Sequence, residues 1–528
     1  MSDQRLRAIF RQLPPELSLK IDHPVIERNE LRLPVKAEAL VPLVTHIHRT
    51  HGTTLVTMHA TDERAREGTF KVHVMLALRG ENAFITIIAS LGLNNLKFDS
   101  LTPHVNEADW YEREIQDMFG LVAVGHPDPR PLVLYDDWPE GLHPLRKDFP
   151  LSHRPPRERT EYSFTIVEGE AVYEIPVGPV HAGVIEPGHF RFSVAGEPII
   201  NLEVRLGYVH KGIEKLSEST PYSKGVYLAE RISGDNGVAH STAYCQAVES
   251  LAACKVPERA EFIRTIMLEL ERLYNLFGDL AGIALDTAFS VPAANGYLLR
   301  EKALNLNECL TGSRLLRSVN VLGGVRRDLT GNDREKIVAT LVKLKLDFED
   351  LTDLMLTSPS MMDRVETTGR LTTEMARSLN VVGPAARASD VDRDVRRDHP
   401  YAAYGRLNFL VPRQSGGDVN ARMRVKMDEV RESFSLIDQA LDGMPGGPVR
   451  AEVGEIHSGG TAFSLVESPR GELVHWIMSG IGAPFRHKIR DASFCNWLAM
   501  EQAVLGNIVP DFPLVNKSFN LSYSGNDL

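Results

Sequence analysis

Cysteine is scarce in this chain. The 528 residues contain four, Cys245, Cys254, Cys309 and Cys495, and no two of them form a CxxC pair. This spacing excludes a thiolate clamp for a metal ion, and a disulfide framework is not expected in a chain of this size. We therefore expect the four cysteines to be small, mostly buried apolar residues.

Long apolar runs are also missing. The richest stretch, residues 83–93 (AFITIIASLGL), is strand-sized and falls short of the roughly 18 residues that span a bilayer. The N-terminal sequence MSDQRLRAIFRQLPPE has no apolar core of the kind found in secretory signals. The sequence therefore predicts no direct membrane span and a cytosolic chain, which can still bind a membrane-bound partner.

Positive charge is in deficit. Lys and Arg total 59 against 70 Asp and Glu, which gives a net charge of -11. Such a chain repels phosphate backbones, so we expect no nucleic-acid partner. The composition, 43% hydrophobic and 24% charged, is that of globular proteins, and the length predicts about two to four domains.

The hydrophobic pattern divides the chain into two regions joined by a linker. Residues 1–150 alternate short β-type runs with helical segments and predict an α+β domain. Residues 151–165 lack periodicity, carry paired prolines and are interpreted as the linker. The expected elements of the first domain are strands at 54–58, 69–78 and 84–89 and a helix at 107–119.

Residues 166–528 carry long apolar stripes at helical spacing. The stripes predict helices over 260–288, 333–356 and 427–441, with Pro257 near the first start and Gly443 at the last end. Stripes of this length indicate helices packed on each other. The fold class is therefore α+β overall, with a mainly α-helical second domain that carries small β additions.

Two groups of motifs give the chain a family resemblance. Residues 110–150, WYEREIQDMFGLVAVGHPDPRPLVLYDDWPEGLHPLRKDFP, resemble the signature of the C subunit of bacterial NADH:quinone oxidoreductase (complex I). The rest resembles the complex I D subunit and, more closely, the large subunit of NiFe hydrogenases of the formate hydrogenlyase and hydrogenase-4 type. The matching blocks are 178–181 (GPVH), 186–191 (EPGHFR), 207–215 (GYVHKGIEK), 323–326 (GGVR), 392–394 (DRD), 398–401 (DHPY) and 467–471 (ESPRG).

The hydrogenase resemblance implies four metal ligands that this sequence lacks. The family holds nickel and iron with two CxxC pairs, whose positions fall on Ser233 and Asn236 and on Ser522 and Gly525. Hydroxyl and amide groups are hard, weak donors that do not replace thiolates, and glycine offers no donor. We therefore expect no NiFe centre and no cofactor bound by this chain itself.

The complex I resemblance implies a quinone site. Its tyrosine position falls on Gly234, whereas its histidine corresponds to His181 or His189. Glu214 matches the acidic residue that relays protons in hydrogenases, so these three residues are the candidate catalytic ones. By resemblance the residues that line the vacated cavity are Glu214, Arg231, Ser233, Asp235, Asn236, His240, Arg490, Ser522 and Asp527.

Together the resemblances imply the large subunit of a redox complex that couples electron transfer to a quinone or another acceptor with ion translocation. The expected partners are a small subunit with an Fe–S cluster, a ferredoxin-like subunit and membrane antiporter-like subunits. The expected location is peripheral, on the cytoplasmic side of the inner membrane. Two alternatives remain open: a genuine hydrogenase with unorthodox ligands, and a non-enzymatic coupling scaffold.

Each candidate site residue also has a purely structural interpretation. Ser233, Asn236, Ser522 and Gly525 are equally explained by a hydrogen-bonded core that replaces a metal site. The histidines can be structural, and Glu214 can be a paired carboxylate. The charged run 387–399 is expected to pack at an interface. Asp117, Arg146 and Asp148 are expected to be turn and docking residues without a catalytic role.

Overall fold

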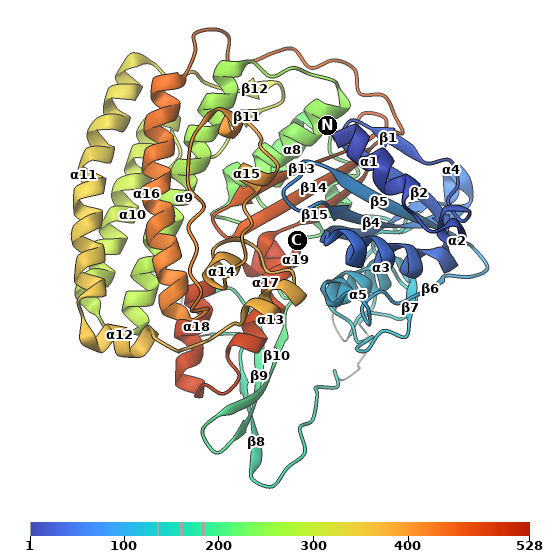
Figure 1. Cartoon of the computed structure of the whole chain (residues 1–528), viewed down its shortest axis with the longest axis horizontal. Helices are drawn as coiled ribbons and strands as arrows, with labels where there is room; N and C mark the ends of the chain where they lie inside the picture. The colour runs from blue at the N-terminus through green and yellow to red at the C-terminus, as the bar shows by residue number, and fades with distance from the viewer. Residues whose placement is uncertain (1, 135–136, 158–161, 182–184) are drawn as a thin grey trace. The chain divides into compact units, whose positions relative to one another are not determined.

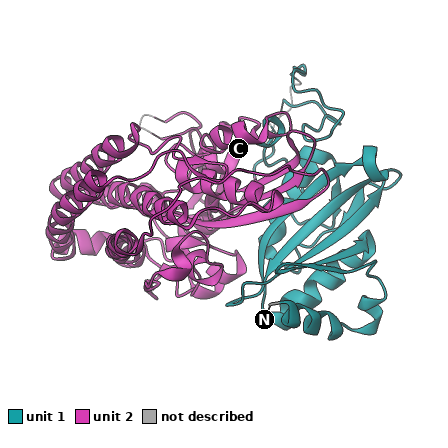
Figure 2. Ribbon diagram, turned by 90° about the horizontal axis from the view of Figure 1, so that it is seen from above, with its two compact units in different colours: residues 1–164, 214–216 teal, residues 165–213, 217–528 magenta. Residues whose placement is uncertain are grey.

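The structure, a computed structural model, describes residues 2–134, 137–157, 162–181 and 185–528. It divides into two compact units, residues 1–164 with 214–216, and residues 165–213 with 217–528 (Figure 2). The boundary between residues 164 and 165 falls at the C-terminal end of the predicted linker. The content is 44% helix and 19% strand, and the predicted α+β fold class is confirmed.

Unit 1 is built on a five-stranded sheet of order β1-β2-β5-β4-β3. Strands β2 and β5 pair in parallel, for example Leu33 with Ile87, and the other pairs are antiparallel. Helices α3 and α5 pack on β5 and β3, which explains why these strands are buried almost throughout. The main elements are β1 (Val25–Glu27), β2 (Glu30–Lys36), α3 (Leu40–His51), β3 (Thr54–Glu63), β4 (Thr69–Ala77), β5 (Phe84–Gly92) and α5 (Asp109–Phe119).

The remaining elements of unit 1 are short. They are α1 (Ser2–Arg11), α2 (Pro15–Ser18), α4 (Arg64–Glu67), β6 (Lys97–Asp99) and β7 (Val122–Val124). Asp117 holds the loop after them, because one of its carboxylate oxygens accepts hydrogen bonds from the backbone N–H groups of residues 132–134. Arg146 donates to the Phe119 carbonyl, and Asp148 pairs with Arg64. These contacts agree with the structural role predicted for Asp117, Arg146 and Asp148.

The long helices of unit 2 run side by side (Figure 1). Helix α9 (Glu258–Asp286) begins directly after Pro257 and packs on α10 (Ser290–Thr311), α16 (Val419–Gly443) and α18 (Phe512–Phe519). Helix α11 (Gly331–Leu356) packs on α10 and α16. Because neighbours surround α9, its charged residues Glu269, Glu271 and Arg272 are buried together with its apolar stripe.

Two three-stranded antiparallel sheets complete the predicted β additions. One has the order β10-β9-β8 and the other β13-β14-β15, and helix α8 (Gly237–Leu251) packs on β13 and β14. The strands are β8 (Val172–Val177), β9 (His189–Ala195), β10 (Ile199–Arg205), β13 (Thr461–Ser468), β14 (Gly471–Ser479) and β15 (Pro484–Arg490).

Shorter elements connect these parts of unit 2. They include α7 (Tyr222–Ala229), β11 (Asn320–Val321), β12 (Gly324–Val325), α12 (Pro359–Val365), α13 (Thr373–Ser378), α14 (Gly383–Ala388), α15 (Val395–Asp398), α17 (Ala492–Ala503) and α19 (Tyr523–Asp527). Helix α6 (Ile213–Ser217) is divided, because its residues 214–216 are assigned to unit 1. Among the helices of the described ranges, none combines the length and apolar character needed to cross a bilayer.

Candidate functional site

The loop before α8 carries Ser233 and Asn236, the first pair of positions where the resemblance predicts thiolates, and α9 fixes the shape of this loop. The Tyr274 hydroxyl and the Asn275 amide donate to the Asp235 carbonyl at 2.6 and 2.9 Å. The Glu271 carboxylate accepts from the first N–H groups of α8, those of Val238 and Ala239. Burial raises the pKa of Glu271 to about 8, against the opposing effect of these N–H groups.

The C-terminal segment carries the second pair and meets this loop directly. The hydroxyl oxygens of Ser522 and Ser233 lie 3.0 Å apart, although the residues are separated by 289 positions. Ser522 caps α19 by accepting from the Gly525 N–H at 2.9 Å, and its own N–H donates to the Ser493 hydroxyl. The structure therefore brings Ser233, Ser522 and Gly525 together, as the family resemblance predicts.

A partly buried ion pair lies beside this contact. Arg470 donates to both oxygens of Asp235 at 3.0 and 2.6 Å, and the Ser233 hydroxyl donates to Asp235 at 2.9 Å. Burial alone would raise the pKa of Asp235, but Arg470 outweighs burial and lowers it to about 2. Asp235 is therefore a fixed negative charge at neutral pH, and its charge is matched by Arg470.

Asn236 is the exception in this well-bonded group. Its side chain is fully buried, yet neither the amide oxygen nor the amide nitrogen has a hydrogen-bond partner among the described residues. Leaving a buried amide unpaired costs about 1–3 kcal/mol. The amide therefore marks a position where a bound molecule or a water would gain hydrogen bonds.

A chain of hydrogen-bonded histidines starts at the Asp491 carboxylate. The Asp491 carboxylate lies 3.1 Å from Nε2 of His240, and Nδ1 of His240 lies 3.0 Å from Nε2 of His475. Nδ1 of His475 lies 3.0 Å from Nε2 of His487, whose Nδ1 is 2.8 Å from the Ser217 hydroxyl. All five side chains are buried. His475 and His487 meet because β14 and β15 pair His475 with Ile489 and Ile477 with His487, which makes the two rings diagonal neighbours on one face.

Three further predicted cavity residues have partners other than Ser233 and Ser522. Arg490 pairs with Glu472 and donates to the Cys495 sulfur at 3.4 Å. The Arg231 side chain is 62% exposed and donates to the Tyr227 carbonyl at 3.0 Å. Asp527 is buried and accepts from the Val209 N–H at 3.1 Å; burial raises its pKa.

The three predicted catalytic residues are engaged by the protein itself. His181 Nε2 lies 2.8 Å from the Gly188 carbonyl, and His189 Nδ1 lies 3.1 Å from the Gly178 carbonyl. Burial lowers the pKa of His189, so its ring is neutral near pH 7. Glu214 is buried in α6. The structure orients both histidines through backbone carbonyls.

The donor set at the replaced positions does not fit a NiFe centre. Ser233 and Ser522 bond each other, Asn236 presents a neutral amide, and Gly525 has no side chain. Nickel and iron of this kind require soft thiolates, which these residues do not provide. Within the described ranges, His, Cys, Asp and Glu side chains do not gather in groups of three suited to a metal ion.

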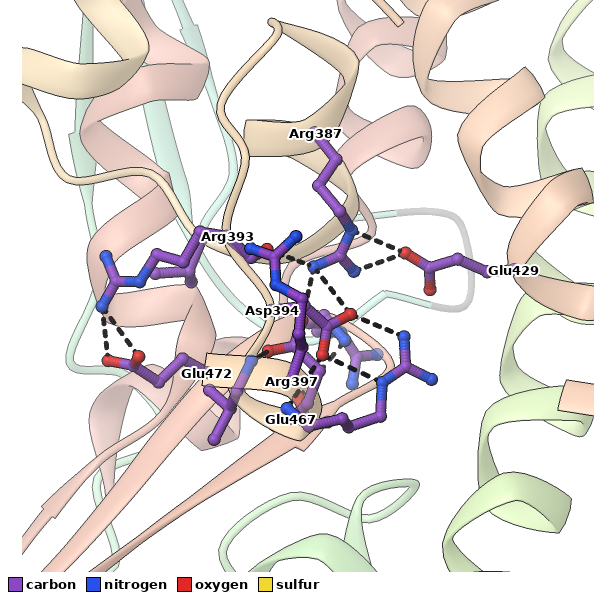
Figure 3. Close-up of polar contacts among 12 residues, drawn as sticks. Arg387, Arg393, Asp394, Arg397, Glu429, Glu467 and Glu472 are labelled. Carbon is purple, nitrogen blue, oxygen red and sulfur yellow. Dashed lines mark hydrogen bonds and ion pairs between the residues drawn. The ribbon is translucent and has the colours of Figure 1, made fainter. Parts of the chain in front are cut away.

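A buried network of arginines and carboxylates lies at β13 and β14 (Figure 3). Arg387 binds Glu429 and donates to Glu467 at 2.8 Å, and Arg396 pairs with Asp394 at 2.7 Å. The charged run 387–399 is predicted to pack at an interface, whereas its Arg387, Asp394 and Arg396 are buried inside unit 2. A second cluster joins Glu472 to Arg393 and Arg490.

Sequence reasoning missed four residues that the site uses. Arg470 stood inside a matching block, and Asp491 directly follows Arg490, but neither was assigned to the site. His475 and His487 were missed because a single histidine in a strand gives no local signal of a partner more than 200 positions away. The pairing of β14 with β15 was the signal that could have joined them.

Comparisons with known proteins place the chain in a family. Residues 33–155 match the family model of the respiratory-chain NADH dehydrogenase 30 kDa subunit, and residues 286–459 and 454–527 match that of the 49 kDa subunit. Formate hydrogenlyase subunit 5 of Escherichia coli is 37% identical over 96% of this chain and 90% of its own length. Hydrogenase-4 component G of the same organism is 36% identical over 94% and 88%.

Two other relatives extend the comparison. The C/D subunit of the NADH-quinone oxidoreductase of Phocaeicola vulgatus is 32% identical over 81% of this chain and 87% of its own length. A solved chain of the membrane-bound sulfane sulfur reductase, an archaeal respiratory membrane complex, is 28% identical with a TM-score of 0.64, covering 68% of this chain and 99% of that one. The chain belongs to the family of complex I C and D type subunits that includes the large subunits of formate hydrogenlyase and hydrogenase-4.

Proposed function

We propose that this chain is the fused large subunit of a membrane-associated oxidoreductase that works without a NiFe centre. It reduces a quinone or another small acceptor at the site formed by Ser233, Asn236 and Ser522, and this reduction is coupled to ion translocation. The observation that carries the proposal is the donor set: all four thiolate positions hold groups that do not bind nickel and iron, and Ser233 and Ser522 bond each other instead.

The relatives support the setting of this reaction. They are subunits of multi-subunit respiratory membrane complexes, and one is named for reducing sulfane sulfur. In the proposal, a partner subunit holds an Fe–S cluster next to the site, a ferredoxin-like subunit feeds that cluster, and antiporter-like subunits move ions. The assembly lies peripherally on the cytoplasmic side of the inner membrane.

In the proposal, each side chain at the site has a separate role. The unpartnered amide of Asn236 binds the polar group of the acceptor, and the Asp235–Arg470 pair fixes the charge beside it. His181, oriented by the Gly188 carbonyl, presents its other ring nitrogen to a quinone headgroup, with His189 as the alternative ligand. Glu214 transfers protons.

Nickel content tests the central claim. We would purify the native complex that contains this chain and measure nickel per chain by elemental mass spectrometry, with Escherichia coli formate hydrogenlyase as the loaded reference. Nickel at background is expected, because the donors are hydroxyl and amide groups. About one nickel per chain would contradict the proposal and restore a hydrogenase with unorthodox ligands.

The Ser233–Ser522 hydrogen bond favours a second candidate, a non-enzymatic scaffold, because it closes the position that a metal would occupy. The same complex would be supplied with electrons from reduced methyl viologen and tested with decylubiquinone and with polysulfide. Turnover of at least one acceptor is expected. Turnover of neither, in a complex that contains its full set of redox centres, would favour the scaffold.

A further inference from the structure

The histidine chain leads out of the site through the core of unit 2. It joins one carboxylate, three imidazoles and one hydroxyl in line, with successive contacts of 3.1, 3.0, 3.0 and 2.8 Å. His240 comes from α8, His475 from β14, His487 from β15, and Ser217 ends α6. Every ring uses one nitrogen toward each neighbour, so the chain has no break from Asp491 to Ser217.

Asp491 sets the direction of these hydrogen bonds. Burial alone would raise its pKa, but the His240 contact outweighs burial and lowers it, so the carboxylate is ionised and only accepts. His240 therefore donates from Nε2, and as a neutral ring it accepts at Nδ1. His475 is neutral, because burial and the neighbouring rings of His487 and His240 lower its pKa well below the usual value. With neutral rings the order is fixed: all three carry their proton on Nε2, and Ser217 donates to His487.

This order of hydrogen bonds allows one proton to move along the chain, and all three rings are neutral again once the transfer is complete. The Ser217 proton passes to Nδ1 of His487, the Nε2 proton of His487 passes to Nδ1 of His475, and that of His475 passes to Nδ1 of His240. The Nε2 proton of His240 then neutralises Asp491. Ser217 regains a proton from its outer side, and the three rings are left protonated on Nδ1. One proton has entered and one sits on Asp491.

The inner end of the chain lies at the candidate site. A Cβ atom placed on Gly525 would lie 2.8 Å from Cγ of Asp491 and 3.0 Å from the Ser522 hydroxyl oxygen. Asp491 therefore contacts the segment that replaces the second thiolate pair. Its other oxygen accepts from the Ser493 N–H at 2.7 Å, so one oxygen holds the backbone while the other faces His240.

We infer that Ser217, His487, His475, His240 and Asp491 form a proton-transfer chain that supplies the acceptor reduced beside Ser522. The inference rests on the proposed function, because the acceptor reduced at the site is what takes up the proton. Imidazole suits this task because it accepts at one nitrogen while it donates from the other. The bland alternative is a static polar core whose three rings only satisfy one another.

The substitution Asp491→Asn tests the proton-transfer chain against the static polar core. The oxygen that accepts from Ser493 must remain an oxygen, so the new NH₂ group faces Nε2 of His240 and forces it to accept. In a coupled chain His240, His475 and His487 then all move their proton to Nδ1. We would label histidine with ¹⁵N in the native complex and read the tautomer of each ring by solid-state NMR, assigned with single-histidine variants.

The expected result is three Nε2–H rings in the wild type and three Nδ1–H rings in the Asp491→Asn variant. A His487 ring that keeps its tautomer in this variant would overturn the chain. Tyr244→Phe is the matched control. Tyr244 lies beside His475 and His487 with ring centroids 6.4 and 5.5 Å away, but its hydroxyl donates to the Tyr222 carbonyl, outside the chain. It should leave all three tautomers unchanged.

Turnover of the complex is a second measurement. It tests the chain through a different variant, in case Asp491→Asn does not fold. Glutamine at position 475 can bond to both neighbours but cannot exchange its protons along the chain. We expect His475→Gln to lower methyl viologen:decylubiquinone turnover at least about tenfold, with Tyr244→Phe near wild type. Unchanged turnover would overturn the proton chain and leave the proposed function standing. Absence of wild-type turnover would count against the proposed function, while the tautomer measurement would still decide the chain.

Discussion

At the scale of single residues, Asn236 is a side chain whose burial is unfavourable, because no hydrogen bond within the described residues compensates for burying its amide. Its amide is buried without a partner among the described residues, while the amide of Asn320, also buried, donates to Ser241 and Thr242 at 2.9 Å. Residues kept for binding often reduce stability in this way. The two asparagines therefore offer a comparison between an amide with neither atom paired and an amide whose nitrogen is paired.

We expect Asn236→Leu to raise the unfolding midpoint in denaturant, because it removes an unpaired amide that costs about 1–3 kcal/mol. The same variant should lower acceptor turnover of the complex, because the acceptor loses its hydrogen bonds. Asn320→Leu should do the reverse and lower the midpoint. A lower midpoint for Asn236→Leu as well would show that the Asn236 amide has a structural partner.

Residue identity alone predicted part of this site. The loop and C-terminal positions Ser233 and Ser522 were found because their replaced thiolates belong to motifs with fixed spacing. The histidine chain was not, because neither the sequence of β14 nor that of β15 indicates which residues its histidine contacts. Only the pairing of strands and the packing of α8 on them bring these rings into line. Polar contacts between distant segments leave no periodic signal.

At the scale of elements, apolar periodicity predicted the long helices well. The stripe over 260–288 became α9 (Glu258–Asp286), and that over 427–441 became the C-terminal part of α16 (Val419–Gly443), which ends at the predicted Gly443. The pattern did not show that α9 is buried on all sides. Glu269 and Arg272 were indistinguishable in sequence from a solvated helix face, yet they bind each other at 3.2 Å in the core.

Strand β14 carries a charged cluster whose pH response can be measured. Burial would raise the pKa of Glu472, but Arg393 and Arg490 outweigh burial and lower it to about 2 from a usual value of 4.5. A carboxyl with a lowered folded-state pKa stabilises the fold above its unfolded pKa, and this contribution is lost as pH falls toward 2. Wild-type stability should therefore fall between pH 4.5 and 2 partly through Glu472.

Glu472→Gln should remove that part of the acid response. At neutral pH it should destabilise unit 2 by about 3–5 kcal/mol, because Arg393 and Arg490 lose their buried counter-charge. Its unfolding midpoint in guanidinium should then depend less on pH across the acid range than that of the wild type. Glu301→Gln, which breaks an exposed pair with Arg314, is the control and should change little. Equal acid slopes for all three proteins would contradict the assignment.

At the scale of the whole molecule, the chain is two units with separate cores. The predicted linker, residues 151–165, ends at the boundary of unit 1. It contains three arginines, Arg154, Arg157 and Arg159, of which Arg159 lies outside the described residues. Arg154 precedes Pro155, which blocks cleavage, whereas the Arg157 side chain is 89% exposed.

We expect limited trypsin digestion to cut first in the linker, after Arg157 or Arg159, because exposed segments without regular structure are preferred sites of nicking. Mass spectrometry should detect fragments that end and begin there. Each should keep a cooperative thermal transition, because each unit has its own core. The double substitution Arg157→Gln and Arg159→Gln should delay this first cut. An initial cut outside residues 151–165 would contradict the division.

The close approach at Gly525 has a consequence for engineering. Cysteine at the four predicted thiolate positions would not by itself create a hydrogenase, because a side chain at position 525 would meet the carboxyl of Asp491 at 2.8 Å. To make room, Asp491 would have to shift from its contacts with His240 and the start of α17. The C-terminal segment and the start of α17 would therefore have to change together.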